Sequence, residues 1–238
     1  YTYYRTRRHT LVSAVGETLK EFPGFRFGVN TIWDRFFVDM PPSTASPPYT
    51  SENLALFDTV KDELRASGGT PYRDALDRAG SFYEGTAGTR SPISHECQQN
   101  FTLAMTDGLW NSSYSGSIDD GSGDGDGVNQ VTLADIGRYY YDNDLDPSLA
   151  NSVQSTVADP KTGTKANYQH MISYGVAFGV TGNLEDNDGD GVPDNDPPGL
   201  PAPPYGVDTP WTDNYPGGDD ETIDDLWHMA YNSTGEFL

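Results

Sequence analysis

The sequence of 238 residues contains one cysteine, Cys97, so the chain cannot form a disulfide within itself. We expect Cys97 to be either a small buried apolar side chain or, preferably, half of a disulfide to a segment outside this chain. The sequence also lacks an initiator methionine and the charged and then apolar pattern of a signal peptide, which indicates a fragment or a processed form. No run approaches the roughly 18 to 20 apolar residues that a membrane-spanning helix needs, so we expect no membrane insertion.

Basic residues are scarce, because 14 Lys and Arg stand against 36 Asp and Glu, which gives a formal net charge of −22. Such a charge repels phosphate backbones and anionic lipid surfaces, so we expect neither nucleic acid nor a membrane surface as a partner. The same carboxylates would repel one another in a compact chain unless some were neutralised. Divalent cations bind carboxylate oxygens, so the composition indicates a metal-binding protein.

Apolar periodicity predicts helices and short strands that alternate along the chain. Helical spacing of apolar residues covers 6–22, 53–65, 71–79, 132–140 and 224–232. Thr132 and Asp135 form a capping-box-like pattern at the start of the fourth of these helices. Strand-like patterns cover 25–32, 101–105, 171–180 and the last residues, 236–238. This alternation is typical of an α/β fold with an open, mostly parallel sheet flanked by helices. We predict a single domain over 1–238, with long acidic loop insertions at about 111–130 and 183–218.

Two loops of the predicted sheet offer oxygen ligands. Thr70, in the Gly-rich segment 67–71, is placed to cap a helix whose first residue is Pro71. Asp107 lies at the C-terminal end of the strand 101–105, where open α/β sheets bind ligands. A hydroxyl and a carboxylate on these loops could together hold a Mg²⁺- or Mn²⁺-like ion that keeps several waters and accepts an acidic ligand.

The most specific motif is an Asp-rich run turned by glycine at 186–196. Alternating carboxylates in such a loop direct oxygens to one point, and Ca²⁺ takes about six to eight oxygen ligands. The predicted ligands, with the valine contributing its carbonyl, are Asp186, Asp188, Asp190, Val192, Asp194 and Asp196. Pro197 stands where an EF-hand has its bidentate Glu, so the loop is similar to thrombospondin-type calcium repeats. The alternative is a solvated acidic loop.

The pentapeptide Asp-Gly-Asp-Gly-Val of this run also occurs earlier, at 124–128. In the same register its oxygen ligands would come from Ser122, Asp124, Asp126 and Val128. Gln130 replaces the aspartate of the ninth loop position, so a weak cation site and a plain flexible loop remain open alternatives.

The histidines and nucleophilic side chains of the sequence do not have the spacing of a catalytic or zinc site. His9, His95, His170 and His228 are scattered without the spacing of a zinc site, so we expect structural roles for them. Ser94 precedes His95 directly, but no Gly-x-Ser-x-Gly nucleophile elbow is present. We therefore expect a protein that is not an enzyme.

Five segments occur in the order and wording typical of one bacterial family. They are 67–71 (SGGTP), 94–111 (SHECQQNFTLAMTDGLWN), 131–145 (VTLADIGRYYYDNDL), 169–180 (QHMISYGVAFGV) and 224–238 (DDLWHMAYNSTGEFL). Together they resemble the von Willebrand factor A-like (vWA-like) domain of the PilY1/PilC family of type IV pilus tip-associated adhesins. The resemblance covers nearly the whole chain apart from the acidic insertions, and it implies a vWA-like, Rossmann-type fold.

The resemblance also implies a site and a cellular setting. In vWA domains an adhesion site for a divalent cation takes a Thr from its second loop and an Asp from its third, which match Thr70 and Asp107. The first strand and the Asp-x-Ser-x-Ser motif of the first loop are expected upstream of this chain. The family implies a larger parent protein with a C-terminal domain. It also implies passage through the periplasm and outer membrane of a Gram-negative bacterium to the extracellular pilus tip.

The leading interpretation is a cell-surface adhesion module of a type IV pilus biogenesis protein, with Ca²⁺ in the Asp-rich loop and Mg²⁺ or Mn²⁺ at the adhesion site. Its partner would be an acidic group on a host or surface receptor, or on pilus subunits. Two alternatives belong to other classes. A Ca²⁺-stabilised secreted hydrolase needs a nucleophile paired with a base, which the sequence does not show. A vWA-like scaffold without metal would be purely structural.

Overall fold

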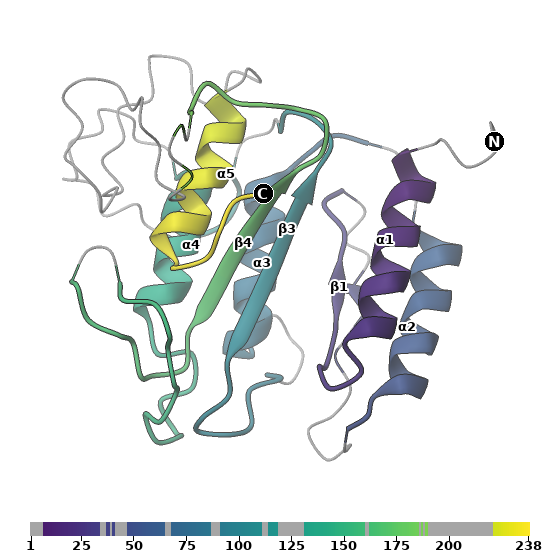
Figure 1. Ribbon diagram of the computed structural model, residues 1–238. Helices are drawn as coiled ribbons and strands as arrows, with labels where there is room; N and C mark the ends of the chain where they lie inside the picture. The colour runs from purple at the N-terminus through teal and green to yellow at the C-terminus, as the bar shows by residue number, and fades with distance from the viewer. Residues whose placement is uncertain are drawn as a thin grey trace. The chain divides into compact units, whose positions relative to one another are not determined.

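The computed structural model describes residues 7–33, 37–38, 40, 47–64, 68–86, 91–110, 114–118, 131–159, 162–185, 187, 189 and 221–238. The chain divides into two compact units, Tyr1–Gly69 and Thr70–Leu238, and each is described by itself. Figure 1 shows the helices and strands of both units. The interpretation of residues 1–238 as a single domain stays a prediction.

The first unit consists of two helices and a short strand pair. The helices, α1 (Arg7–Glu21) and α2 (Thr50–Glu63), match the predicted ones to within a few residues. The predicted strand at 25–32 is wrong for most of its length, because only β1 (Val29–Asn30) pairs, antiparallel to β2 (Phe37–Val38). The alternating phenylalanines that suggested a strand instead pack on one another after the Pro23 turn. The ring of Phe25 lies 6.0 Å from Phe22 and 6.3 Å from Phe27.

Helices α1 and α2 run antiparallel and complete each other's C-terminal ends. Arg8, in the first turn of α1, donates from Nε to the carbonyl of Leu64, which follows α2 (2.8 Å). Asn53, in the first turn of α2, donates from Nδ2 to the Leu19 carbonyl near the end of α1 (3.1 Å). The last carbonyls of a helix have no partner within it, so these side chains satisfy acceptors that would otherwise need water.

The second unit contains a parallel sheet, as predicted. Strands β3 (Asn100–Thr106) and β4 (Met171–Ala177) pair in parallel along their whole length, from Asn100 opposite Met171 to Thr106 opposite Ala177. The end of the chain joins the other edge of β4 through a parallel bridge between Gly175 and Phe237. Together with the helices this arrangement is compatible with the predicted α/β class, and the vWA-like fold stays a prediction.

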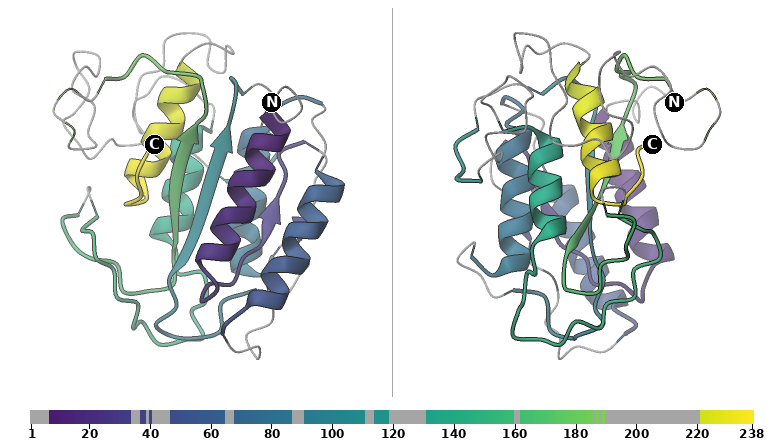
Figure 2. Two further views of the ribbon diagram at one scale, coloured as in Figure 1. Left: turned by 45° about the vertical axis from the view of Figure 1, so that its right-hand side comes forward. Right: turned by 90° about the vertical axis from the view of Figure 1, so that its left-hand side faces the viewer.

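Three helices surround this sheet, namely α3 (Tyr72–Glu84), α4 (Leu133–Asp142) and α5 (Glu221–Asn232). Figure 2 shows α3 and α4 side by side on one face of the strands. Tyr83, near the end of α3, donates its hydroxyl to the carbonyl of Phe101, near the start of β3 (2.8 Å). Helix α3 therefore runs antiparallel to β3, and its first residue lies at the C-terminal edge of the sheet. None of the described helices is long and apolar enough to cross a membrane.

Two details of the predicted elements are wrong. Helix α3 begins at Tyr72, one residue after the predicted start, and Pro71 directly before it makes no side-chain cap bond. The reason is that Pro71 has a ψ of 68°, which lies outside the helical region. Strand β3 is not fully buried, since Phe101 and Leu103 are 37% and 56% exposed. Helices α3 and α4 cover one face of the sheet, and alternate side chains of a strand point to opposite faces. Phe101 and Leu103 therefore point away from these two helices.

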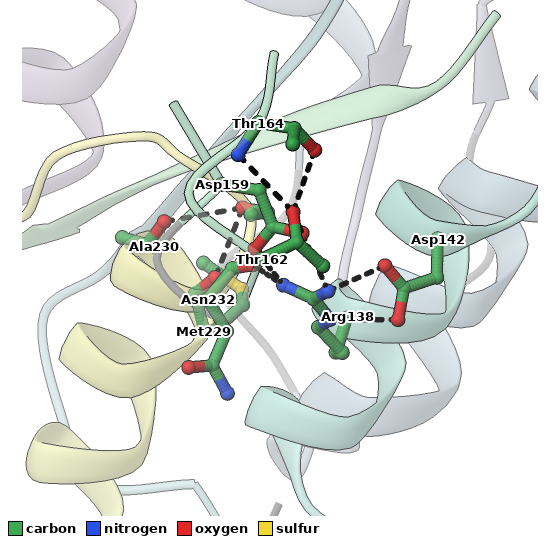
Figure 3. Close-up of polar contacts among 9 residues, drawn as sticks. Arg138, Asp142, Asp159, Thr162, Thr164, Met229, Ala230 and Asn232 are labelled. Atoms are coloured by element: carbon green, nitrogen blue, oxygen red, sulfur yellow. Dashed lines mark hydrogen bonds and ion pairs between the residues drawn. The ribbon is translucent and has the colours of Figure 1, made fainter. Parts of the chain in front are cut away.

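A buried ion pair ties the connection between α4 and β4 to the helices (Figure 3). Arg138 of α4 contacts both carboxylate oxygens of Asp159, at 2.8 and 3.0 Å, and both of Asp142, at 2.7 and 2.6 Å. It also donates to the carbonyl of Asn232, the last residue of α5 (3.1 Å). Thr162 donates its hydroxyl to Asp159 from the far side (3.0 Å). The side chains of Arg138 and Asp159 are only 9% and 7% exposed, whereas that of Asp142 is 41% exposed.

We predict that Asp159→Asn lowers the free energy of unfolding by about 3 kcal/mol, because it leaves much of a buried guanidinium charge uncompensated. The matched variant Asp142→Asn should cost less than about 1 kcal/mol, since that carboxylate is half-exposed and solvent screens it. Urea denaturation of both variants measures the difference. Equal losses would show that burial does not decide the strength of the two pairs.

Candidate functional site

The C-terminal edge of the sheet is held together by a buried tryptophan. Trp110 follows β3 and is 1% exposed. Its indole N–H donates to the carbonyl of Thr222, in the first turn of α5 (2.9 Å). The guanidinium of Arg73, in the first turn of α3, lies 5.0 Å from the centre of the Trp110 ring. One side chain thus joins the end of β3 to the starts of two helices.

Arg73 also reaches the start of α4. Its Nη1 donates to the carbonyl of Val131 at 2.7 Å, two residues before the helix. The helix then opens with the predicted capping box, in which the hydroxyl of Thr132 accepts from the Asp135 amide and the Asp135 carboxylate accepts from the Thr132 amide (3.1 and 2.6 Å). This motif is confirmed. The starts of α3, α4 and α5 therefore meet at the edge of the sheet where β3 ends.

The two remaining amides at the start of α4 bind a side chain from another helix. The Asp225 carboxylate of α5 accepts from the amides of Leu133 and Ala134 at 2.8 and 3.0 Å. Asp225 is fully buried. The first amides of a helix carry a partial positive charge, so a carboxylate there is stabilised although it is shielded from water.

Its neighbour Asp224 binds a different segment. The Asp224 carboxylate accepts from the amides of Asn183 and Leu184, at 2.8 and 3.0 Å. These residues follow β4 and precede the Asp-rich run. A Cβ atom on Gly182 would lie 1.9 Å from the Asp224 carboxylate, so this close approach requires glycine. Burial raises the pKa of the Asp224 carboxyl above its ordinary value, and the two backbone donors offset part of that rise.

The two predicted adhesion-site residues lie on loops at this same edge. Thr70 is half-buried just before α3, and Asp107 is exposed directly after β3. Arg73 lies three positions after Thr70, and Trp110 lies three positions after Asp107. The guanidinium of Arg73 packs on the ring of Trp110. The loops are therefore neighbours. A joint role of Thr70 and Asp107 in holding a cation stays a prediction.

The predicted ligands of both calcium loops lie outside the described residues. They comprise Asp186, Asp188, Asp190, Val192, Asp194 and Asp196 of the later run and Ser122, Asp124, Asp126 and Val128 of the earlier one. Within the part of the chain that the structure describes, no group of three or more His, Cys, Asp or Glu could hold a metal ion. Calcium binding therefore stays a prediction based on the sequence.

Part of the first predicted insertion is packed against α3. The hydroxyl of Tyr114 donates to Asp77 at 2.8 Å, and both the amide and hydroxyl of Ser115 bind Asp74, at 3.0 and 2.9 Å. Residues 114–118 thus form a loop that side-chain and backbone hydrogen bonds attach to α3.

Two of the histidines, His95 and His170, make contacts within the fold. His170 is 3% exposed and its Nδ1 lies 2.7 Å from the Tyr168 carbonyl, and burial lowers its pKa. Ser94 Oγ lies 2.8 Å from His95 Nδ1, but the Ser94 amide also binds the Gln98 side chain (3.2 Å) within the same turn. The contacts of Ser94 with His95 and Gln98 are those of a local turn. Cys97 is exposed, which corrects the alternative of a buried thiol.

Comparisons with known proteins agree on one family. The type IV pilus biogenesis factor PilY1 of Pseudomonas aeruginosa strain PAK is 27% identical in an alignment of length 229, and the match covers 80% of this chain and 19% of that protein. PilY1 of strain UCBPP-PA14 is 30% identical in an alignment of length 207, and the match covers 73% of this chain and 17% of that protein. No protein-family model matches the chain, and no solved structure matches it significantly.

The chain therefore spans less than a fifth of the length of the curated relatives it matches. Its second unit is an α/β structure with a parallel sheet and three helix starts gathered at the C-terminal edge of that sheet. Its relatives are pilus biogenesis factors. The chain belongs to the PilY1 family.

We predict that Asp225→Asn lowers the free energy of unfolding by about 1–3 kcal/mol, because two buried amides lose a charged acceptor. Hydrogen exchange at Leu133 and Ala134 should accelerate more than exchange at other amides of α4. Amide exchange followed by NMR, together with urea denaturation, measures both effects. Unchanged exchange at these two amides would show that the Asp225 contacts do not hold the start of α4.

Proposed function

We propose that this chain is a vWA-like adhesion module of a type IV pilus biogenesis protein, located at the cell surface. The proposal assigns it a divalent-cation site at Thr70 and Asp107. It also assigns a Ca²⁺ ion to the run from Asp186 to Asp196. The partner would present an acidic group that completes the coordination of the cation.

The main support is the joining of the loops of Thr70 and Asp107 through Arg73 and Trp110. Ligands of open α/β sheets bind at the C-terminal edge, where loops from several strands come together. A hydroxyl and a carboxylate there are suited to Mg²⁺ or Mn²⁺, which keep water ligands that an acidic group can replace. The names of the relatives support the link to type IV pili.

The charge distribution supports the calcium site. Residues 166–238 contain no lysine or arginine, although this stretch includes the whole Asp-rich run. Carboxylates there can be balanced by backbone amides, as Asp224 and Asp225 are, or by cations from solution. Six oxygen-bearing residues around glycine turns match the ligands that Ca²⁺ takes.

The proposed module performs no covalent chemistry. The contacts of Ser94 with both His95 and Gln98 suit a turn better than a nucleophile activated by a base. Binding and mechanical attachment need only the cation and the surrounding edge of the sheet. The remaining parts of the parent protein, including a C-terminal domain, would connect the module to the pilus.

We predict that Ca²⁺ stabilises the chain by roughly 2.7 kcal/mol at about a hundredfold excess over Kd, if only the folded state binds it. Asp188→Ala should remove most of this gain, because it deletes a central ligand of the run. Thermal unfolding and calorimetric titration of chelator-stripped protein measure the effect. Asp126→Ala tests the earlier Asp-Gly-Asp-Gly-Val copy, and Asp58→Ala on α2 controls for the loss of one exposed charge. An unchanged calcium response in Asp188→Ala would assign binding elsewhere.

We further predict that a chain extended upstream to include the Asp-x-Ser-x-Ser loop gains affinity for Mg²⁺ or Mn²⁺. Asp107→Ala should abolish that affinity, since it removes the exposed carboxylate at the end of β3, whereas Asp58→Ala should leave it intact. Isothermal titration of Mn²⁺ into the extended chains measures it. An extended wild type without affinity would contradict the adhesion site and favour a scaffold without metal.

A further inference from the structure

Two adjacent acidic side chains of α5 reach different partners. Asp225 accepts from the first amides of α4, whereas Asp224 accepts from the amides of Asn183 and Leu184. Asp224 therefore contacts the segment through which the chain leaves β4. The first proposed calcium ligand, Asp186, lies two residues beyond Leu184.

The Asp224 contact is specific in shape as well as in charge. Asp224 is 4% exposed, so its carboxylate is shielded from water and depends on protein donors. The space for it exists because Gly182 has no side chain, since a Cβ atom there would approach the carboxylate to 1.9 Å. Two consecutive amides converging on one buried oxygen fix the position and direction of the backbone at Asn183 and Leu184.

We propose that Asp224 is a positioning residue for the calcium run: it fixes the backbone at Asn183 and Leu184, from which the chain enters the run, and so favours Ca²⁺ binding there. This inference rests on the proposed function, because it concerns the affinity of the same calcium site. A metal site whose surrounding contacts are already formed binds more tightly, as the outer-shell partners of known metal ligands show. By linkage, bound Ca²⁺ in turn strengthens the attachment of this segment to α5.

The test is a calorimetric titration of Ca²⁺ into the chelator-stripped 238-residue chain and three variants. Asp224→Asn removes the charged acceptor. Gly182→Ala places a methyl group at the position of the Asp224 carboxylate and so displaces it. Each should weaken Ca²⁺ binding by about tenfold without changing its stoichiometry. Both substitutions disrupt the same contact, so their effects should not add. The double variant should bind Ca²⁺ as tightly as the single variant that has the lower affinity. Amide exchange at Asn183 and Leu184 should be faster in all three.

The control is Asp225→Asn, which weakens the start of α4 but leaves the contacts to Asn183 and Leu184. Its Ca²⁺ affinity should equal that of the wild type even though its stability falls. Equal weakening in Asp224→Asn and Asp225→Asn would overturn the positioning role, since the effect would then follow general stability. Unchanged affinity in Asp224→Asn and Gly182→Ala would overturn it as well. A wild type that binds no Ca²⁺ would instead overturn the proposed calcium site, and this inference with it.

Discussion

The buried carboxylate of Asp225 is the contact on which the C-terminal edge of the sheet in the second unit depends. A helix start leaves amides without partners, and the capping box of α4 satisfies only part of them. Asp225 satisfies the amides of Leu133 and Ala134 from another helix. A buried charge is costly without such donors, so neither α4 nor α5 can move away without leaving polar groups unsatisfied. The two helix starts are therefore fixed to each other by electrostatics.

This fixed pair gives the loops of the edge a rigid base. Trp110 attaches the end of β3 to α5, and Arg73 packs on its ring while binding the segment before α4. The loops that carry Thr70 and Asp107 leave from these anchored points. Binding residues on loops are effective when the scaffold beneath them is stiff, because less ordering is then required on association. The polar contacts under the edge would thus support the proposed binding site without touching a ligand.

The sequence was informative where a local pattern decides the structure. The strand around Leu103 and the capping box of Thr132 and Asp135 depend on neighbouring residues, and both were predicted. The predicted start of α3 is wrong by one residue because the backbone at Pro71 lies outside the helical region, which residue preferences do not reveal. Asp225 was missed since its partners lie about ninety residues away, and no spacing rule connects positions so far apart.

Because the partners of a carboxylate can lie far away in the sequence, acidic composition alone does not show which carboxylates bind a metal ion. Asp224 and Asp225 add to the negative charge of the sequence, yet backbone amides of helix α4 and of the segment after β4 bind both carboxylates. Such carboxylates need no cation. An Asp-rich stretch in which carboxylates alternate with glycine, within a region that has no lysine or arginine, is different, because its charge must be balanced by many donors or by one ion. Spacing, and not net charge, therefore separates the carboxylates that hold the fold from those proposed to hold calcium.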